Sequence, residues 1–214
     1  MTLPLIIIGA GGHARVLISV LKTLNRDILG MTETAPDKLA AGINGISVLG
    51  NDDLILARSP DSIELVNGIG SVSSTQIRKE IYIRFKQHGY SFASVIHPSA
   101  MIMEDVRLGE GVQIMAGAIV QPGCVIGDNS IVNTGAVVDH DCLIGAHVHV
   151  APGVVLSGGV RIGEMTHVGT AAAVIEEIEI GPAAVVGAGA VVITDIPAGV
   201  KAFGVPAKII ERRQ

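Results

Sequence analysis

The second half of the chain repeats its hydrophobic pattern every six residues. Between Ile96 and Pro197 each block of six begins with Ile, Leu or Val, and its fifth residue is Ala, Val, Cys, Ser, Thr or Ile. This period is neither helical nor a simple alternation, and it is typical of a parallel β-helix, whose short strands meet at corners. We therefore expect the first and fifth positions of every block to face a narrow interior.

A longer period is superimposed on the first. Five glycines recur at intervals of eighteen residues: Gly109, Gly127, Gly145, Gly163 and Gly181. Eighteen is three blocks of six, so each coil is expected to be a triangle, with these glycines stacked at one corner. Neighbouring coils should lie about 4.8 Å apart and pair their backbone polar groups. The outer faces keep many apolar residues, which predicts packing against identical chains with three-fold symmetry.

The first half begins with a different pattern. Residues 3–8 read as a buried strand, and the apolar spacing over 15–25 indicates a helix. The turn between them places Gly9, Gly11 and Ala14 at the spacing G-x-G-x-x-G/A. Strand, glycine turn and helix together form a phosphate-binding unit, because bare backbone N–H groups and the helix N-terminus face the anion. A plain tight turn without a ligand is the alternative.

A second strand and turn follow in the first half. Residues 62–71, "SIELVNGIGS", run into a glycine-rich turn, and 74–89 form a helical pattern. This region is too short for a two-lobed dinucleotide fold, so it favours a nucleotide sugar over NAD. We expect a Rossmann-like βαβ nucleotide-sugar-binding domain over 1–91 and an all-β helix domain with a C-terminal tail over 92–214.

Composition and charge narrow the function classes. The chain is 49% hydrophobic but only 2% aromatic, and its net charge of −5 offers no basic patch for nucleic acid. With no apolar run long enough to cross a membrane and no secretory start, we expect a soluble cytoplasmic protein. Cys124 and Cys142 occupy the small inward position one coil apart. A disulfide would be geometrically possible there, but buried reduced thiols are the preferred interpretation.

The histidines of the repeat allow two chemical interpretations. His149 and His167 lie one coil apart at the sixth position, and His147 or His140 could add a third imidazole from the same or an adjoining chain. Histidine pairs are good zinc ligands, and trimeric β-helices such as the gamma-class carbonic anhydrases build such sites. A metal-dependent hydratase is therefore one candidate. The nucleotide-binding first half argues against it.

The second interpretation is a general base. His140 is third in its block, at or near a corner, with Asp139 and Asp141 beside it and Gly158 one coil away. A carboxylate can hold one ring nitrogen and leave the other free to take a proton. The Gly158 N–H could then stabilise an oxyanion. A solvated surface histidine is the alternative, and His147 is expected simply to face solvent.

These motifs carry a resemblance to a known family. "GAGGHARV", "SVIHPSA", "VNTGAVVDHDCLIG", "HVHVAPGVVLSGGVRIG" and "GVPAK", together with the hexapeptides, span nearly the whole chain. The chain resembles the hexapeptide-repeat sugar O- and N-acyltransferases, and most closely the bacterial UDP-4-amino-sugar N-acetyltransferases of the UDP-N,N'-diacetylbacillosamine pathway. The resemblance implies a left-handed β-helix, a homotrimer with an active site in each groove between subunits, acetyl-CoA as co-substrate and no required metal.

The resemblance also assigns roles to residues of this chain. His140 would take a proton from the 4-amino group of a UDP-4-amino-4,6-dideoxy sugar, Asp141 would orient it, and the amine would attack the thioester directly. Relatives usually have an Asp-Asp pair near uridine at the end of the strand that follows the first helix. There this chain reads "GMTETAPD" and offers Glu33 instead. The other residues expected at the substrate are Gly11, Gly12, His13, Gly70 and Asn133. Those expected at the coenzyme are His149, Gly158, Gly169, Thr170, Gly187, Ala188, Val205, Pro206, Ala207 and Lys208.

Two further functions stay open on the same scaffold. One is O-acetylation of a sialic acid or a similar sugar. The other is a non-catalytic scaffold or ligand sensor, which would bind acetyl-CoA or a nucleotide without transferring an acetyl group.

Overall fold

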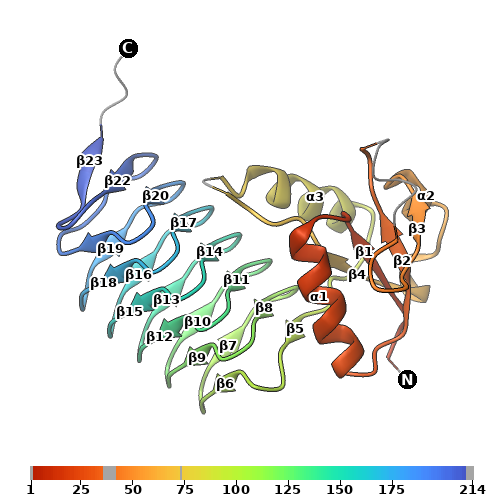
Figure 1. Cartoon of the computed structure of the whole chain (residues 1–214), viewed down its shortest axis with the longest axis horizontal. Helices are drawn as coiled ribbons and strands as arrows, with labels where there is room; N and C mark the ends of the chain where they lie inside the picture. The colour runs from red at the N-terminus through yellow and green to blue at the C-terminus, as the bar shows by residue number, and fades with distance from the viewer. Residues whose placement is uncertain (1, 36–41, 73, 211–214) are drawn as a thin grey trace.

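The computed structural model describes residues 2–35, 42–72 and 74–210. It has an α/β part followed by a long stack of coils, and the two parts pack side by side (Figure 1). The elements of the first part are β1 (Leu5–Ile8), α1 (Gly12–Thr23), β2 (Ile28–Thr32), β3 (Val48–Gly50), α2 (Asp53–Leu56), the 3-10 helix η2 (Pro60–Ser62), β4 (Glu64–Asn67) and α3 (Gln76–Gln87).

The α/β part is built on a parallel sheet with the strand order β3-β2-β1-β4. β1 is wholly apolar and buried because it has a neighbour on each side and helices over the sheet. Since β1 and β4 are adjacent and parallel, the glycine turns that follow them leave the same edge of the sheet. The predicted strand–turn–helix unit and the second strand are both present.

The second part is a left-handed parallel β-helix. Its strands form three sheets that make the sides of a prism, and strands one coil apart pair residues eighteen positions apart, as Val125 pairs with Leu143. The strands are β5 (Val95–Ile96), β6 (Met101–Ile102), β7 (Arg107–Leu108), β8 (Gln113–Ile114), β9 (Ile119–Val120), β10 (Val125–Ile126), β11 (Ile131–Val132), β12 (Val137–Val138), β13 (Leu143–Ile144), β14 (His149–Val150), β15 (Val155–Leu156), β16 (Arg161–Ile162), β17 (His167–Val168), β18 (Ala173–Val174), β19 (Glu179–Ile180), β20 (Val185–Val186), β21 (Val191–Val192), β22 (Lys201–Phe203) and β23 (Lys208–Ile210).

The interior of the prism is the one that the six-residue period predicts. The first and fifth positions of the blocks form one continuous buried cluster from Val112 to Ala202, with the earliest coil only partly buried. At one corner the predicted glycines stack, and a Cβ on Gly127 would lie 2.5 Å from the Ala146 nitrogen of the next coil. Cys124 and Cys142 are buried free thiols in the structure.

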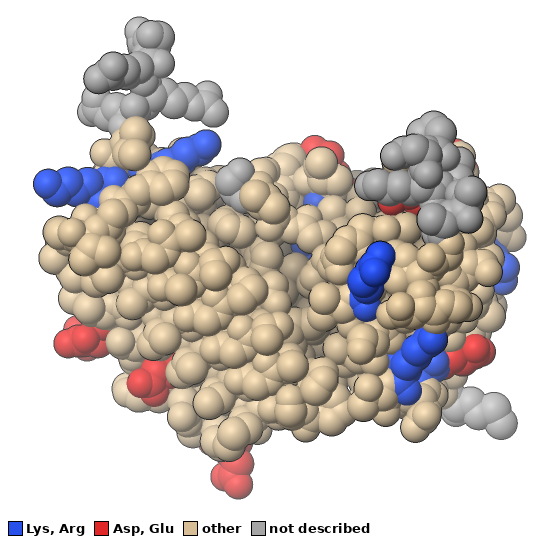
Figure 2. Space-filling model, in the orientation of Figure 1, with Lys and Arg blue, Asp and Glu red and all other residues tan. Residues whose placement is uncertain are grey.

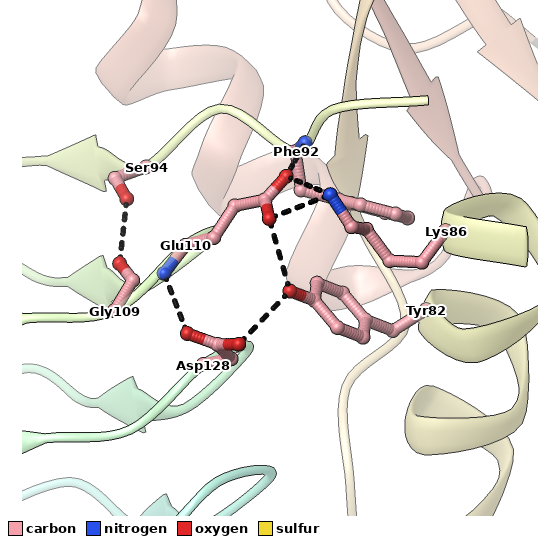
Figure 3. Close-up of polar contacts among 7 residues, drawn as sticks. All are labelled: Tyr82, Lys86, Phe92, Ser94, Gly109, Glu110 and Asp128. Atoms are coloured by element: carbon pink, nitrogen blue, oxygen red, sulfur yellow. Dashed lines mark hydrogen bonds and ion pairs between the residues drawn. The ribbon is translucent and has the colours of Figure 1, made fainter. Parts of the chain in front are cut away.

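A polar cluster joins the two parts where α3 meets the first coils (Figure 3). The Glu110 carboxylate accepts a hydrogen bond from the Phe92 N–H at 2.7 Å and pairs with Lys86 Nζ at 2.7 Å. The Tyr82 hydroxyl lies 3.3 Å from carboxylate oxygens of both Glu110 and Asp128, and burial beside these acids raises the Tyr82 pKa. Asp128 in turn accepts from the Glu110 N–H at 2.8 Å. These contacts fix α3 on the β-helix.

The connection between the two parts runs through the predicted domain boundary. Phe92 bridges to Leu65 in β4, and β5 begins only three residues later, at Val95. The segment at 91–93 therefore belongs to the edge of the first sheet as much as to the start of the prism. The division into 1–91 and 92–214 stays a prediction. Among the described residues, no helix has both the length and the apolar character needed to cross a bilayer.

Candidate active site

A cleft of about 660 Å³ lies between the glycine turns of the α/β part and one corner of the prism. Its lining includes all six residues that the sequence predicted for the substrate, together with one predicted for the coenzyme. These are Gly11, Gly12, His13, Glu33, Gly70, Asn133 and His149. Residues separated by more than a hundred positions are thus brought to one site. The remaining predicted residues lie elsewhere on the β-helix.

The first glycine turn offers backbone donors to the cleft. Gly11 is the N-cap of α1 and brings no capping side chain, and among the described residues no side chain caps the first N–H groups of the helix. Glu33 lies beside this turn, where its Oε2 accepts from the Ala10 N–H at 3.1 Å and its Oε1 accepts from the Thr34 N–H at 2.9 Å. The cleft therefore combines a helix N-terminus, which suits an anion, with the Glu33 carboxylate.

A buried chain of hydrogen bonds holds the floor of the cleft. His13 Nε2 lies 2.7 Å from Gln113 Oε1, and Gln113 Nε2 donates to the Asn67 carbonyl at 2.8 Å. Because the Gln113 amide nitrogen donates to a carbonyl, its oxygen must be the acceptor, so His13 carries a proton on Nε2. Burial, aided by the charge of Arg78, lowers the His13 pKa to about 4. His13 is therefore neutral at pH 7.

Arg78 ties the second glycine turn to the β-helix. Its guanidinium is fully buried and donates to the carbonyls of Asn67 at 2.8 Å, Ile69 at 2.9 Å and Asn129 at 3.0 Å. Burial lowers the Arg78 pKa to about 9, so the group stays charged at neutral pH. Neither Arg78 nor Gln113 was among the predicted site residues. Gln113 is polar among apolar neighbours, which was a weak signal, whereas Arg78 lies in a polar and charged stretch that does not set it apart.

His149 and His167 lie next to each other, as expected, with ring centroids 5.0 Å apart and the rings nearly perpendicular. His149 hydrogen-bonds Ser71 through Nδ1 at 2.5 Å and Asn133 through Nε2 at 3.0 Å. Both of its ring nitrogens are thus engaged. In the part of the chain that the structure describes, no three His, Cys, Asp or Glu side chains are grouped to hold a metal ion.

His147 is not the solvent-facing residue that the sequence suggested. It is buried, its Nδ1 lies 3.0 Å from Asn129 Nδ2, and its ring packs edge-on against Tyr82 at 5.4 Å. That prediction is wrong because the packing of α3 over this face of the prism covers a position that a bare coil would expose.

His140 occupies the corner between β12 and β13. Its Nδ1 lies 2.9 Å from Asp141 Oδ2, so the shorter acid does reach the ring, and its backbone N–H donates to Asp139 Oδ1 at 2.7 Å. The His140 side chain is 63% exposed. The hydrogen bond with Asp141 raises the His140 pKa. The imidazole extends over Gly158, where a Cβ would lie 2.5 Å from Nε2. This nitrogen has no partner among the described residues, so it is available to a reactant.

The residues predicted for the coenzyme fall into two groups. One group lies at the same corner of the prism as Asn133, on later coils spaced eighteen residues apart, and consists of Gly169, Thr170, Gly187 and Ala188. Their wall ends at the hairpin of β22 and β23, whose connecting turn contains Val205, Pro206 and Ala207, with Lys208 beginning β23. Gly158 lies instead with His140 at the next corner, across the six-stranded sheet.

The outward side of that six-stranded sheet is apolar. The first residue of each two-residue strand points away from the core, and in this sheet the series is Met101, Ile119, Val137, Val155, Ala173 and Val191. Val155 is 45% exposed. An apolar surface thus separates the cleft corner from the His140 corner. In the view of Figure 2, few Lys, Arg, Asp or Glu side chains lie over the β-helix.

Comparisons with known proteins agree with both halves of the molecule. A family model described as the PglD N-terminal domain matches residues 4–85, and one described as the bacterial transferase hexapeptide matches 105–140 and 123–158. No curated protein matches the chain.

Several solved structures are similar over almost their whole length. A histidine-to-asparagine variant of perosamine N-acetyltransferase from Caulobacter crescentus, in complex with CoA and GDP-perosamine, is 38% identical, with 97% of each chain covered and a TM-score of 0.91. The acetyltransferase domain of PglB from Neisseria gonorrhoeae, in complex with acetyl coenzyme A, is 36% identical, with 98% of this chain and 100% of that chain covered and a TM-score of 0.89. WeeI from Acinetobacter baumannii shares the fold at 24% identity and a TM-score of 0.87.

Proposed function

The chain belongs to the hexapeptide-repeat sugar O- and N-acyltransferases, and on that basis we propose that it transfers an acetyl group from acetyl-CoA to the 4-amino group of a UDP-4-amino-4,6-dideoxy sugar. Its class, an acyltransferase, follows from the family. One observation carries the proposed chemistry: the imidazole of His140 is oriented by Asp141 and presents a free Nε2 beside Gly158.

The proposed reaction uses this imidazole first as a base and then as an acid. As the sugar amine attacks the thioester carbon, a C–N bond forms and His140 Nε2 takes the proton that the nitrogen loses. The negative charge that develops on the carbonyl oxygen is stabilised by the Gly158 N–H, which donates no hydrogen bond to other described residues. When the C–S bond breaks, the CoA thiolate receives the proton from His140. The sugar amide and free CoA are the products.

The geometry of one chain supports a shared site. The cleft and the wall of glycines lie at one corner of the prism, whereas His140 lies at the next, so a bound amino sugar and its base would meet if a second chain packed between them. The apolar outward row of the six-stranded sheet is a surface that such a neighbour would cover. A homotrimer closes this arrangement with three equivalent grooves. A cytoplasmic location is part of the proposal, in keeping with the free thiols.

GDP-linked sugars are the second candidate substrates. They are favoured by the similarity to the perosamine enzyme, whose structure contains GDP-perosamine. In this chain Glu33 is the carboxylate beside the turn, and it already accepts hydrogen bonds from backbone N–H groups. A carboxylate can accept from a ring N–H of either base, so the nucleotide preference needs a direct measurement.

The decisive experiment measures transfer of labelled acetyl from acetyl-CoA to a panel of UDP- and GDP-linked 4-amino sugars and free sialic acids. Transfer to the nitrogen of one nucleotide sugar supports the proposal. Transfer only to a sialic acid hydroxyl would establish the O-acetyltransferase, and binding without transfer to any acceptor would establish a ligand sensor.

The role of His140 is tested separately. The His140→Ala variant is expected to lose about 10²- to 10⁴-fold in turnover, with an unchanged fold because the side chain is exposed. His88→Ala, an exposed histidine next to α3, is the matched control. Turnover of the His140 variant within a few-fold of the unsubstituted protein would remove the base from the proposal.

A further inference from the structure

The orientation of the Asn133 amide is determined by its neighbours. Asn133 Oδ1 lies 2.8 Å from the Thr134 backbone nitrogen, which can only donate. The oxygen of the amide must therefore face Thr134, and the Nδ2 group must face His149. At 3.0 Å from His149 Nε2, Nδ2 donates to that ring nitrogen.

This hydrogen bond determines the protonation of His149. A nitrogen that accepts from an amide N–H carries no proton, so the proton of the neutral ring is on Nδ1. Burial is the main reason why the His149 pKa is lowered to about 3, so the ring is neutral at pH 7. Nδ1–H then donates to the Ser71 Oγ, 2.5 Å away. Because Asn133 donates to Nε2 of His149, the ring donates from Nδ1 to Ser71 on the opposite wall of the cleft.

The Ser71 hydroxyl is left with a hydrogen to give. It accepts from His149 and has no other hydrogen-bond partner in the described ranges of the chain. Ser71 follows Gly70 in the second glycine turn and lines the cleft. We propose that the Ser71 hydroxyl donates a hydrogen bond to an oxygen of the bound nucleotide sugar, through a directional series Asn133 to His149 to Ser71 to ligand. This inference rests on the proposed function and adds a binding residue to its site.

The chemistry of the ligand fits this donor. A nucleoside diphosphate and the sugar attached to it both present acceptor oxygens, and a hydrogen bond to a charged phosphate oxygen is stronger than one to a neutral group. Backbone N–H groups at the start of α1 also lie beside the cleft, on the α/β part. Ser71 would add a donor whose direction is set by the β-helix, because His149 and Asn133 belong to that part. Ligand binding would then depend on the contact between the α/β part and the β-helix.

The first test is binding, by calorimetry, of three probes to the full chain: UDP, GDP and a UDP-4-amino-4,6-dideoxy sugar. Ser71→Ala is expected to weaken at least the nucleotide sugar by about 10- to 100-fold. Weakening that extends to UDP or GDP locates the acceptor on the diphosphate, and weakening confined to the nucleotide sugar locates it on the sugar. Ser71→Thr, which keeps the hydroxyl, should recover most of the affinity.

The matched control is Ser74→Ala, an exposed serine of the same loop that does not line the cleft. It should bind all probes as the unsubstituted protein does. Affinities of Ser71→Ala within two-fold of the unsubstituted protein for every probe would overturn the inference. Failure of the unsubstituted protein to bind any probe would instead count against the proposed function.

The second test reads the direction of the hydrogen bonds without any ligand. Long-range ¹⁵N–¹H spectra distinguish the two neutral forms of a histidine, and His149→Gln identifies the signals. We expect the proton of His149 on Nδ1. In Asn133→Asp the new carboxylate should draw the proton to Nε2, so that the Ser71 hydroxyl turns to donate to Nδ1.

The Asn133→Asp variant also gives a quantitative prediction. Once the Ser71 hydrogen points at His149, removing the hydroxyl should cost little, so Ser71→Ala in the Asn133→Asp background should change nucleotide-sugar affinity by less than about three-fold. Additive losses in that double-mutant cycle, or a proton on Nε2 of His149 in the unsubstituted protein, would contradict the series.

Discussion

Replacing Gly158 with alanine should move the proposed base without removing it. The added Cβ would lie 2.5 Å from His140 Nε2 and 2.6 Å from Cε1, whereas ordinary contacts begin at 3.4 Å. The imidazole must therefore shift by about 1 Å, the difference between these distances. Gly158 is not among the glycines with positive φ, so alanine fits the backbone there. The clash is with the end of an exposed side chain, which can move at little cost to the fold.

The expected effect is large on catalysis and small on stability. Misplacing a catalytic group by about 1 Å can cost about 10²-fold in rate. We therefore expect kcat of Gly158→Ala to fall by about 100-fold, while the melting temperature stays within about 2 °C because the added methyl group meets only the exposed, movable side chain of His140.

The assay measures release of the CoA thiol at saturating substrates, with a thermal melt of the same preparation. Glu176→Ala, at the exposed equivalent position one coil further, is the control and should leave both values unchanged. A kcat within three-fold of the unsubstituted protein would refute the argument, because the base would then tolerate a displacement that this geometry makes unavoidable.

Three other predictions follow from the same structure. Asp141→Asn should shift the acid limb of the kcat/KM profile to lower pH, because the Asp141 hydrogen bond raises the His140 pKa; an unmoved limb would contradict this. His13 and His149 have folded pKa values of about 4 and about 3 against 6.5 for free histidine, so the stability from keeping them neutral is fully present above pH 6.5. It should fall by about 1.4 kcal/mol per pH unit for each group as the pH drops from about 6 to about 4, and a flat pH dependence in urea unfolding would count against buried neutral rings. Val155→Lys places a charge in the middle of the apolar face and should reduce the proposed trimer to monomers in light scattering while the chain stays folded, whereas a trimer that persists in this variant would locate the interface elsewhere.

The prism was predictable from the sequence because its rules are local and repeated. Every inward position recurs one coil later. The six-residue period therefore predicts burial residue by residue, and the eighteen-residue glycine period predicts the corner. His140 could be located at a corner for the same reason. The spacing of a repeat specifies where a side chain starts and which face it occupies.

The cleft was less predictable because it depends on how the two parts pack. Gln113 is an outward residue of β8 and His147 lies in the corner turn before β14, so a lone β-helix would leave both in water. The α/β part covers that face, so Gln113 becomes a bridge to His13 and His147 is buried against Tyr82. The contact of Ser71 with the β-helix was unpredictable for the same reason, because its partner His149 is 78 positions away. No short-range pattern reports such long-range contacts.

The column of residues that runs from Asn133 through Gly169 to Gly187 has a length that is set by the number of coils. Each coil adds one strand spacing of about 4.8 Å, and whole coils can be inserted or deleted without changing the cross-section of the prism. With the proposed coenzyme site, a chain with one more triplet of hexapeptides between the cleft and the closing hairpin would have a coenzyme channel longer by that increment, and its proposed nucleotide site would not change. Under the proposed function, the length of the coenzyme channel can therefore change only in steps of one coil, so the number of coils would determine how long an acyl carrier fits.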